Sequence, residues 1–166
     1  MSENIINRVL EKRGWILADG GIGTQLFDMG LQAGDAPELW NKTESKKIRS
    51  LYQGSIDAGS DLFLTNSFGS NTCRLRLHGK DKDSFELSKL SAEIASEEIN
   101  KQSRTIILAG SIGPTGEILE PLGSLSFREA MEIFHIQAEG LKEGGADVLW
   151  IETISHFDEL RAAVRA

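Results

Sequence analysis

Two stretches of this chain, GSDLFLTNS (residues 59–67) and GADVLWIET (residues 145–153), match position for position. Each begins with Gly, a small residue and Asp, passes through four apolar or nearly apolar positions, and ends in a polar pair. A short apolar run bounded in this way is typical of a buried β-strand. The chain therefore carries the same strand unit at least twice.

The unit also has a period. Apolar strand-sized runs begin near Trp15, Leu62, Thr105 and Val148, which gives a repeat of roughly 43 residues. The runs are continuous rather than alternating in polarity, and a segment of helical spacing lies between each pair. Strands buried on both faces and joined by helices predict an α/β fold with a parallel sheet.

Five helices are expected around these strands. They are a leading helix over Asn4–Arg13, one that starts at Thr43 and carries Ile48 to Ile56, one that carries Leu87 to Ile94, one between Ser126 and Gly144 with Glu129 in capping-box spacing, and one that begins near Ser155 with Phe157, Leu160 and Val164 on its apolar face. Eight such units make a closed eight-stranded barrel of ~340 residues. Four units predict that residues 1–166 form one domain, the amino-terminal half of such a barrel.

Composition narrows the possible partners. The 18 basic and 25 acidic residues give a net charge of −7, and no Lys/Arg-rich run is present to follow a phosphate backbone. The apolar runs are far shorter than the ~20 residues of a membrane span. A single cysteine, Cys73, permits no internal disulfide, which favours a reducing cytoplasm. Nucleic acid and membrane are not expected as partners.

Polar or glycine-rich sequence follows every strand. The segments are Asp19-Gly20-Gly21, Asn66-Ser67-Phe68, Gly110 to Gly113 and Glu152-Thr153. In parallel α/β proteins the carboxyl ends of the strands form one face, and that face binds the substrate. We expect Glu152 to meet a cationic group of a substrate there.

Structural roles are the alternatives for the same residues. Asp19 before two glycines is also a turn former, and Glu152 could pair with an arginine inside the barrel. Thr65 and Ser67 could simply satisfy backbone groups at a strand end. From the residues alone, both interpretations stay open.

Other chemistries find little support. GSIGPTG (residues 110–116) lacks the spacing of a nucleotide-binding fingerprint, and no lysine ends a strand. No Cys/His spacing predicts a zinc site, and Cys73 is expected to be a small buried side chain. His135, on a helix among apolar residues, is expected to pack in the core.

Four motifs, in order, resemble those of the homocysteine S-methyltransferase family. They are LADGGIGTQL (17–26), AGSDLFLTNSFGSN (58–71), AGSIGPTG (109–116) and EGGADVLWIETI (143–154). The resemblance covers nearly the whole chain, and GDAPELWN (34–41) is most similar to the bacterial betaine-type members.

The resemblance implies a (β/α)₈ barrel in which strand-end residues hold homocysteine. Carried over, the substrate-binding residues are Asp19, Gly20, Thr65, Ser67, Phe68 and Glu152. The family also binds zinc through three cysteines, one after the sixth strand and two after the eighth. This chain has no counterpart of those positions, and Cys73 matches none of them.

The implied activity is methyl transfer from an onium donor such as betaine to homocysteine, which gives methionine. The thiol of pKa about 8.5 needs the zinc to become the thiolate nucleophile. The half-barrel alone is therefore expected to be inactive, and to self-associate or to pair with a missing C-terminal half. The alternatives are a non-catalytic half-barrel module for amino-acid binding or assembly, and a piece of an unrelated barrel enzyme acting on an amino acid.

Overall fold

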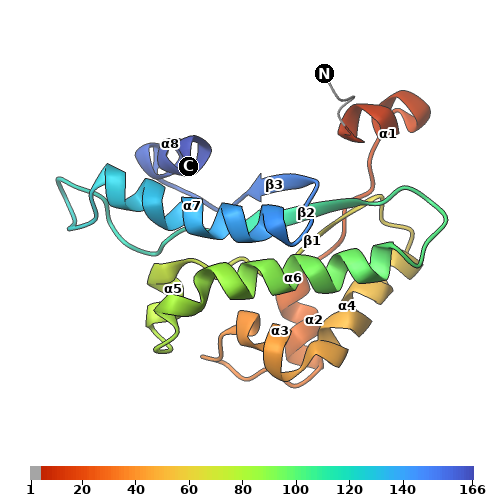
Figure 1. Ribbon diagram of the computed structural model, residues 1–166, viewed down its shortest axis with the longest axis horizontal. Helices are drawn as coiled ribbons and strands as arrows, with labels where there is room; N and C mark the ends of the chain where they lie inside the picture. The colour runs from red at the N-terminus through yellow and green to blue at the C-terminus, as the bar shows by residue number, and fades with distance from the viewer. Residues whose placement is uncertain (1–4) are drawn as a thin grey trace.

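A computed structural model describes residues 5–166 as an α/β fold with an open parallel sheet (Figure 1). The strands are β1 (Leu62–Leu64), β2 (Ile107–Ile112) and β3 (Val148–Ile151). The helices are α1 (Ile5–Arg13), α2 (Ile22–Asp28), α3 (Trp40–Thr43), α4 (Ser45–Asp57), α5 (Thr72–Arg76), α6 (Ser84–Ile99), α7 (Phe127–Glu143) and α8 (Phe157–Arg165), with single 3₁₀ turns η1 (Pro37–Leu39) and η2 (Asp81–Asp83).

The sheet has the order β1-β2-β3, and both neighbouring pairs are parallel. Leu62 pairs with Ile107, and Ala109 pairs with Val148. Helices connect the strands, as a parallel arrangement requires. The predicted fold class, parallel β/α repeats, is confirmed over these units.

The predicted first strand, residues 15–18, is not a full strand. Only Ala18 forms a bridge, to Leu62, although Leu17 accepts hydrogen bonds from the backbone N–H groups of Asp61 and Leu62. The segment lies beside β1 with no partner on its other side, and Trp15 is 51% exposed. Because residues 15–18, among the described residues, form hydrogen bonds with β1 alone, they lie at an edge of the sheet and do not keep regular strand geometry.

The matching stretches share one local structure. Gly59 (φ 87°) and Gly145 (φ 99°) end α4 and α7 in the left-handed conformation that glycine adopts most easily. Two residues later, Asp61 Oδ2 accepts the Leu17 N–H at 3.0 Å, and Asp147 Oδ2 accepts the Leu108 N–H at 2.9 Å. The repeated aspartate therefore ties the start of each strand to the preceding segment.

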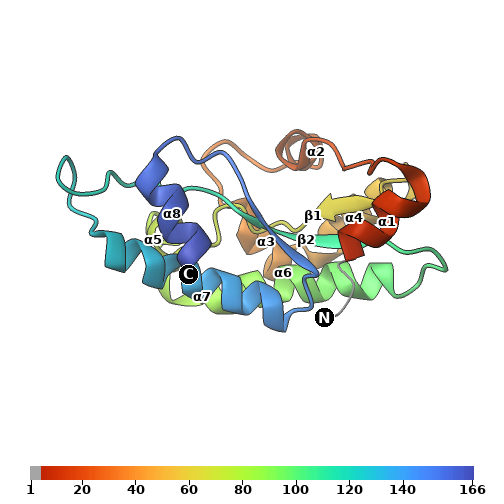
Figure 2. The ribbon, with the colours of Figure 1, turned by 90° about the horizontal axis from the view of Figure 1, so that it is seen from above.

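Two cores lie on opposite faces of the sheet. The larger packs Phe63 and Leu108 against the helices, and Figure 2 shows α6 and α7 running along that side. On the other face, Val9 of α1 packs over Leu62 and Ile107 near the amino ends of the strands. Because α1 covers only that end, the carboxyl ends on this face are left for a pocket.

The β3 side of the sheet is incompletely covered. β1 and β2 are largely buried, as predicted, whereas Leu149 and Trp150 of β3 are 46% and 41% exposed. The predicted apolar face of α8 is also exposed, with Phe157 at 72%. The sheet thus ends in an open apolar edge.

Helix predictions succeeded where the helices are long. The Ser126–Glu129 capping box of α7 is confirmed, and the leading helix is confirmed over Ile5–Arg13, while its expected start at Asn4 lies outside the described residues. His135 is not packed in the core as expected: its side chain is exposed on α7, with Nδ1 2.8 Å from the Ala166 carbonyl oxygen. Helices α2 and α3 were missed because they have only 7 and 4 residues. Within residues 5–166, no helix has the length and apolar composition to span a membrane.

Candidate functional site

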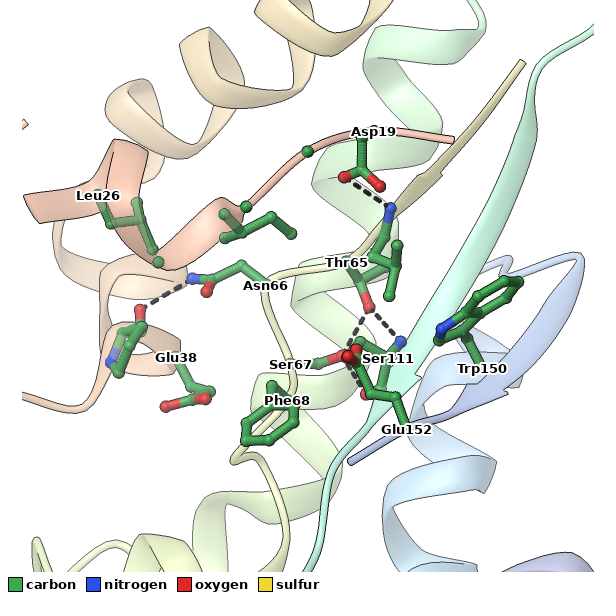
Figure 3. Close-up of a pocket in the computed structure, with 16 residues that line it drawn as sticks. Asp19, Leu26, Glu38, Thr65, Asn66, Ser67, Phe68, Ser111, Trp150 and Glu152 are labelled. Carbon is green, nitrogen blue, oxygen red and sulfur yellow. Dashed lines mark hydrogen bonds between the residues drawn. The ribbon is translucent and has the colours of Figure 1, made fainter. Parts of the chain in front are cut away.

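A pocket of about 370 Å³ lies at the carboxyl ends of the strands (Figure 3). All six predicted site residues line it: Asp19, Gly20, Thr65, Ser67, Phe68 and Glu152. They come from three separate segments of the chain, so the fold brings together what the sequence separates. Whether they bind a substrate stays a prediction.

Asp19 occupies one side of the pocket. Its Oδ2 accepts the Leu64 N–H at 3.2 Å, whereas its Oδ1 is buried without a hydrogen-bond partner in the protein. Burial raises the pKa of Asp19 to about 6, against the lowering effect of the Leu64 N–H, and the nearby Glu152 raises it further. A buried carboxylate oxygen without a partner favours binding of a cationic or hydrogen-bond-donating ligand.

The raised pKa predicts how stability depends on pH. Between its ordinary value of 3.8 and about 6, native Asp19 holds a proton that the unfolded chain has released. This group therefore destabilises the fold progressively as pH rises through that window. Asp19→Asn cannot ionise and keeps an acceptor for Leu64, so near pH 7 it should be the more stable form, by on the order of 1 kcal/mol given partial exposure. Urea unfolding at several pH values measures the difference, and a gap that does not shrink toward pH 4 would contradict it.

Glu152 enters the pocket from the end of β3. Its N–H donates to the Ile112 carbonyl, and its Oε1 accepts the Ser111 hydroxyl at 2.7 Å. The next residue, Thr153, has φ 60°, an uncommon conformation for a β-branched side chain. The chain turns sharply at this point, and such strain concentrates at functional sites. No arginine pairs with Glu152, so the structural alternative finds no support among the described residues.

Thr65 and Ser67 continue the β1–β2 ladder with their side chains. The Thr65 N–H still donates to the Ala109 carbonyl, but beyond it the Ser111 N–H donates to Thr65 Oγ1 at 3.0 Å. The Ser67 hydroxyl donates to the Ser111 carbonyl at 2.8 Å, which leaves Thr65 to donate to Ser67 across 2.6 Å. Both hydroxyl protons are therefore used inside the protein. Thr65 and Ser67 therefore have the structural role considered in the sequence analysis, in which their hydroxyls bond to backbone groups at the strand ends. Any contact with a substrate would be made in addition to these hydrogen bonds.

Several lining residues were not predicted to act at the site. Ser111 was seen only as part of a glycine-rich strand end, and its hydroxyl contact with Glu152 depends on the β2–β3 register. Trp150 faces the pocket because it is two residues before Glu152 on the same strand. Glu38 reaches the pocket from η1 and accepts the Gly69 N–H, and burial raises its pKa. No periodic signal in the sequence marks such a loop contact.

The pocket has an acidic and aromatic lining. Asp19, Glu38 and Glu152 contribute carboxyl groups, Phe68 and Trp150 contribute rings, and none of the lining residues is Lys, Arg or His. This combination suits a small ligand with a positively charged group. It disfavours an anionic ligand without a compensating cation.

A metal ion does not fit the described residues. Within residues 5–166, no group of three or more His, Cys, Asp or Glu side chains is arranged to hold one. Cys73 is buried on α5 beside Arg76 and α7, and it does not line the pocket. No part of the chemistry of this chain is therefore assigned to a metal held by these residues.

The fold and the pocket define an α/β protein with parallel strands and a pocket lined by acidic residues at their carboxyl ends. The sequence model of the homocysteine S-methyltransferase family matches residues 16–166, and the chain belongs to this family. The resemblance inferred from the four motifs is confirmed. The alternative of an unrelated barrel enzyme is wrong, because one family covers nearly the whole chain.

Individual relatives agree with this assignment. A methionine synthase from Mycobacterium leprae is 30% identical over 158 residues, which are 90% of this chain and 13% of the relative. A homocysteine S-methyltransferase from Escherichia coli is 29% identical over 177 residues, covering 96% of this chain and 56% of the relative. The chain thus spans little more than half of one relative and a small part of the other.

A solved structure supports the fold. The oxidized form of the homocysteine methyltransferase MmuM from E. coli superposes with a TM-score of 0.80 at 26% identity, covering 96% of this chain and 60% of MmuM. The metallated form of MmuM gives the same TM-score at 25% identity. The open sheet therefore matches part of the MmuM fold.

Proposed function

We propose that this chain is the homocysteine-binding, amino-terminal half of a homocysteine S-methyltransferase barrel domain. One observation carries the proposal: Asp19, whose buried Oδ1 has no hydrogen-bond partner, lines the same pocket as Glu152. Family membership and the names of the relatives support homocysteine as the ligand.

The pocket matches the chemistry of a small zwitterion. The homocysteine ammonium lies between Asp19 and Glu152, where it gives the free Asp19 oxygen a donor and offsets the repulsion between two carboxylates. Gly20, Phe68 and the hydroxyl ends at Thr65 and Ser67 fix the remainder of the amino acid. A volume of about 370 Å³ is within the usual range of small-molecule sites.

This half orients homocysteine without activating its thiol. Carboxylates close to a thiol disfavour the thiolate, and no lining residue supplies a positive charge. The metallated form of MmuM supports a metal in the complete enzyme, and we propose zinc, held by cysteines outside this chain. The chain alone is then inactive. Zinc, when bound, supplies the charge that converts the thiol to the nucleophile.

A ligand comparison tests the proposal. L-homocysteine should bind in calorimetry with reductant present, whereas 4-mercaptobutanoate, which keeps the thiol and carboxylate but lacks the ammonium, should bind at least about tenfold more weakly. The loss follows from the unpaired acidic groups. Equal affinity for the two ligands would remove the ammonium site, and no binding of homocysteine would overturn the proposed function.

A second candidate function is a non-catalytic half-barrel module for amino-acid binding or assembly. The open edge at Leu149, Trp150 and Phe157 favours it, because exposed apolar strands and helices mark association surfaces. The edge is covered either by a second copy or by a complementary C-terminal half. Sedimentation of the chain alone separates these: a monomer that associates only with a complementary half supports the enzyme, and a stable homodimer that binds homocysteine supports the module.

Two finer points stay predictions. Betaine as methyl donor rests on the GDAPELWN stretch, from which Pro37 and Glu38 line the pocket. The cytoplasmic location rests on the single cysteine, Cys73.

A further inference from the structure

A buried amide lies behind the strand ends of the pocket. Gln137 of α7 is 0% exposed and does not line the pocket. Its Nε2 donates to the Ser67 carbonyl at 2.6 Å and to the Ser111 carbonyl at 3.2 Å. Because both neighbours are carbonyl oxygens, only the NH₂ end of the amide can face them. One side chain therefore joins three elements that are far apart in the sequence.

The amide acts where the β1–β2 ladder stops. Beyond Thr65 the regular β1–β2 ladder is interrupted, because the Ser67 N–H turns back to the Thr65 carbonyl, and the next backbone hydrogen bond between the two segments runs from the Gly113 N–H to the Phe68 carbonyl. The Ser111 carbonyl is instead satisfied by the Ser67 hydroxyl and by Gln137. Gln137 thus replaces backbone hydrogen bonds that the departing strand cannot make.

The arrangement leads directly to Glu152. Ser111, whose carbonyl Gln137 holds, donates its hydroxyl to Glu152 Oε1 at 2.7 Å. The other end of the Gln137 amide, Oε1, is buried without a partner. A buried polar atom left unsatisfied is unfavourable, so an apolar residue of similar size would pack more easily at this position. The two donated bonds explain why an amide is present.

We propose that Gln137 is a positioning residue that clamps the ends of β1 and β2 and thereby fixes the Ser111 hydroxyl that orients the Glu152 carboxylate. The consequence for ligand affinity rests on the proposed homocysteine site, but the clamp itself does not. Gln137 touches no ligand and acts through Ser67 and Ser111.

The test uses Gln137→Met, which keeps the side-chain length and removes both donors. Amide hydrogen exchange should accelerate selectively at Ser111 and Gly113, whose N–H groups bond across the clamped ends to Thr65 and Phe68. Exchange at Asp147, whose N–H bonds at the other end of the sheet, should be unchanged. Homocysteine affinity should fall about tenfold.

A matched control is Ser88→Ala. It removes a buried hydrogen bond of α6, to the Ser84 carbonyl, without touching the strand ends. It should lower overall stability but leave affinity and the Ser111 exchange unchanged. If Gln137→Met fails to fold, Ser111→Ala takes its place, with the affinity it loses restored by Ser111→Thr, which keeps the hydroxyl.

The outcomes are distinct. In Gln137→Met, faster amide hydrogen exchange confined to Ser111 and Gly113, together with weaker homocysteine binding, supports the proposed clamp. Acceleration spread evenly over the sheet, or unchanged exchange at Ser111 and Gly113, would overturn it. If the parent chain binds no homocysteine, the proposed function fails, and the exchange pattern still decides the role of Gln137.

Discussion

Replacing Glu152 with Gln should abolish measurable homocysteine binding, with a loss on the order of a hundredfold or more. The substitution removes the negative charge that faces the homocysteine ammonium in the proposed complex. It preserves the fold locally, because the Gln amide oxygen can still accept the Ser111 hydroxyl that now bonds to Glu152. Calorimetry with L-homocysteine measures the effect.

Glu143→Gln is the matched control for that experiment. Glu143 is an exposed residue at the end of α7 whose carboxylate meets Lys89, away from the pocket. It changes the net charge of the chain by the same amount, so a general charge effect would appear in both variants. Unchanged affinity in Glu152→Gln would refute the assignment of Glu152.

Catalysis should require the part of the barrel that this chain does not cover. The chain alone is expected to form no detectable methionine from homocysteine and a methyl donor. Co-expression with the part of MmuM that this chain does not cover should raise the rate by on the order of a hundredfold or more. The reason is that a thiol of pKa about 8.5 is only about 3% ionised at pH 7, and the described residues do nothing to increase that fraction.

A substitution at the exposed β3 edge of the sheet tests whether the gain in activity depends on assembly of the two halves. Leu149→Lys places a charge on the exposed face of β3, where lysine discourages strand pairing, without altering a pocket-lining residue. The variant should bind homocysteine normally yet gain little activity from the added half. Full activity of the unmodified chain by itself would contradict the proposal that this half-barrel binds homocysteine without activating its thiol.

The sequence predicted what depends on local chemistry. Continuous apolar runs identified β1, β2 and β3, and the glycine and aspartate at 59, 61, 145 and 147 marked the starts of β1 and β3. The position of Asp19 and Glu152 at strand ends predicted that they would share one pocket, because parallel strands present their carboxyl ends on one side.

What the sequence did not predict depends on tertiary contacts. Residues 15–18 have strand composition but lose regular pairing at an uncovered edge. His135 lies among apolar residues in the sequence, yet the helix turns it outward. The roles of Ser111 and Gln137 follow from register and from a helix that packs across two strand ends, and neither is visible in a motif.

A crystal structure of the chain with L-homocysteine tests the central claim most directly. We expect the ammonium nitrogen within hydrogen-bond distance of both Asp19 and Glu152, at about 2.7 to 3.2 Å, with the thiol directed away from the three strands. Homocysteine bound outside this pocket, or bound in it with its ammonium remote from both carboxylates, would contradict the account.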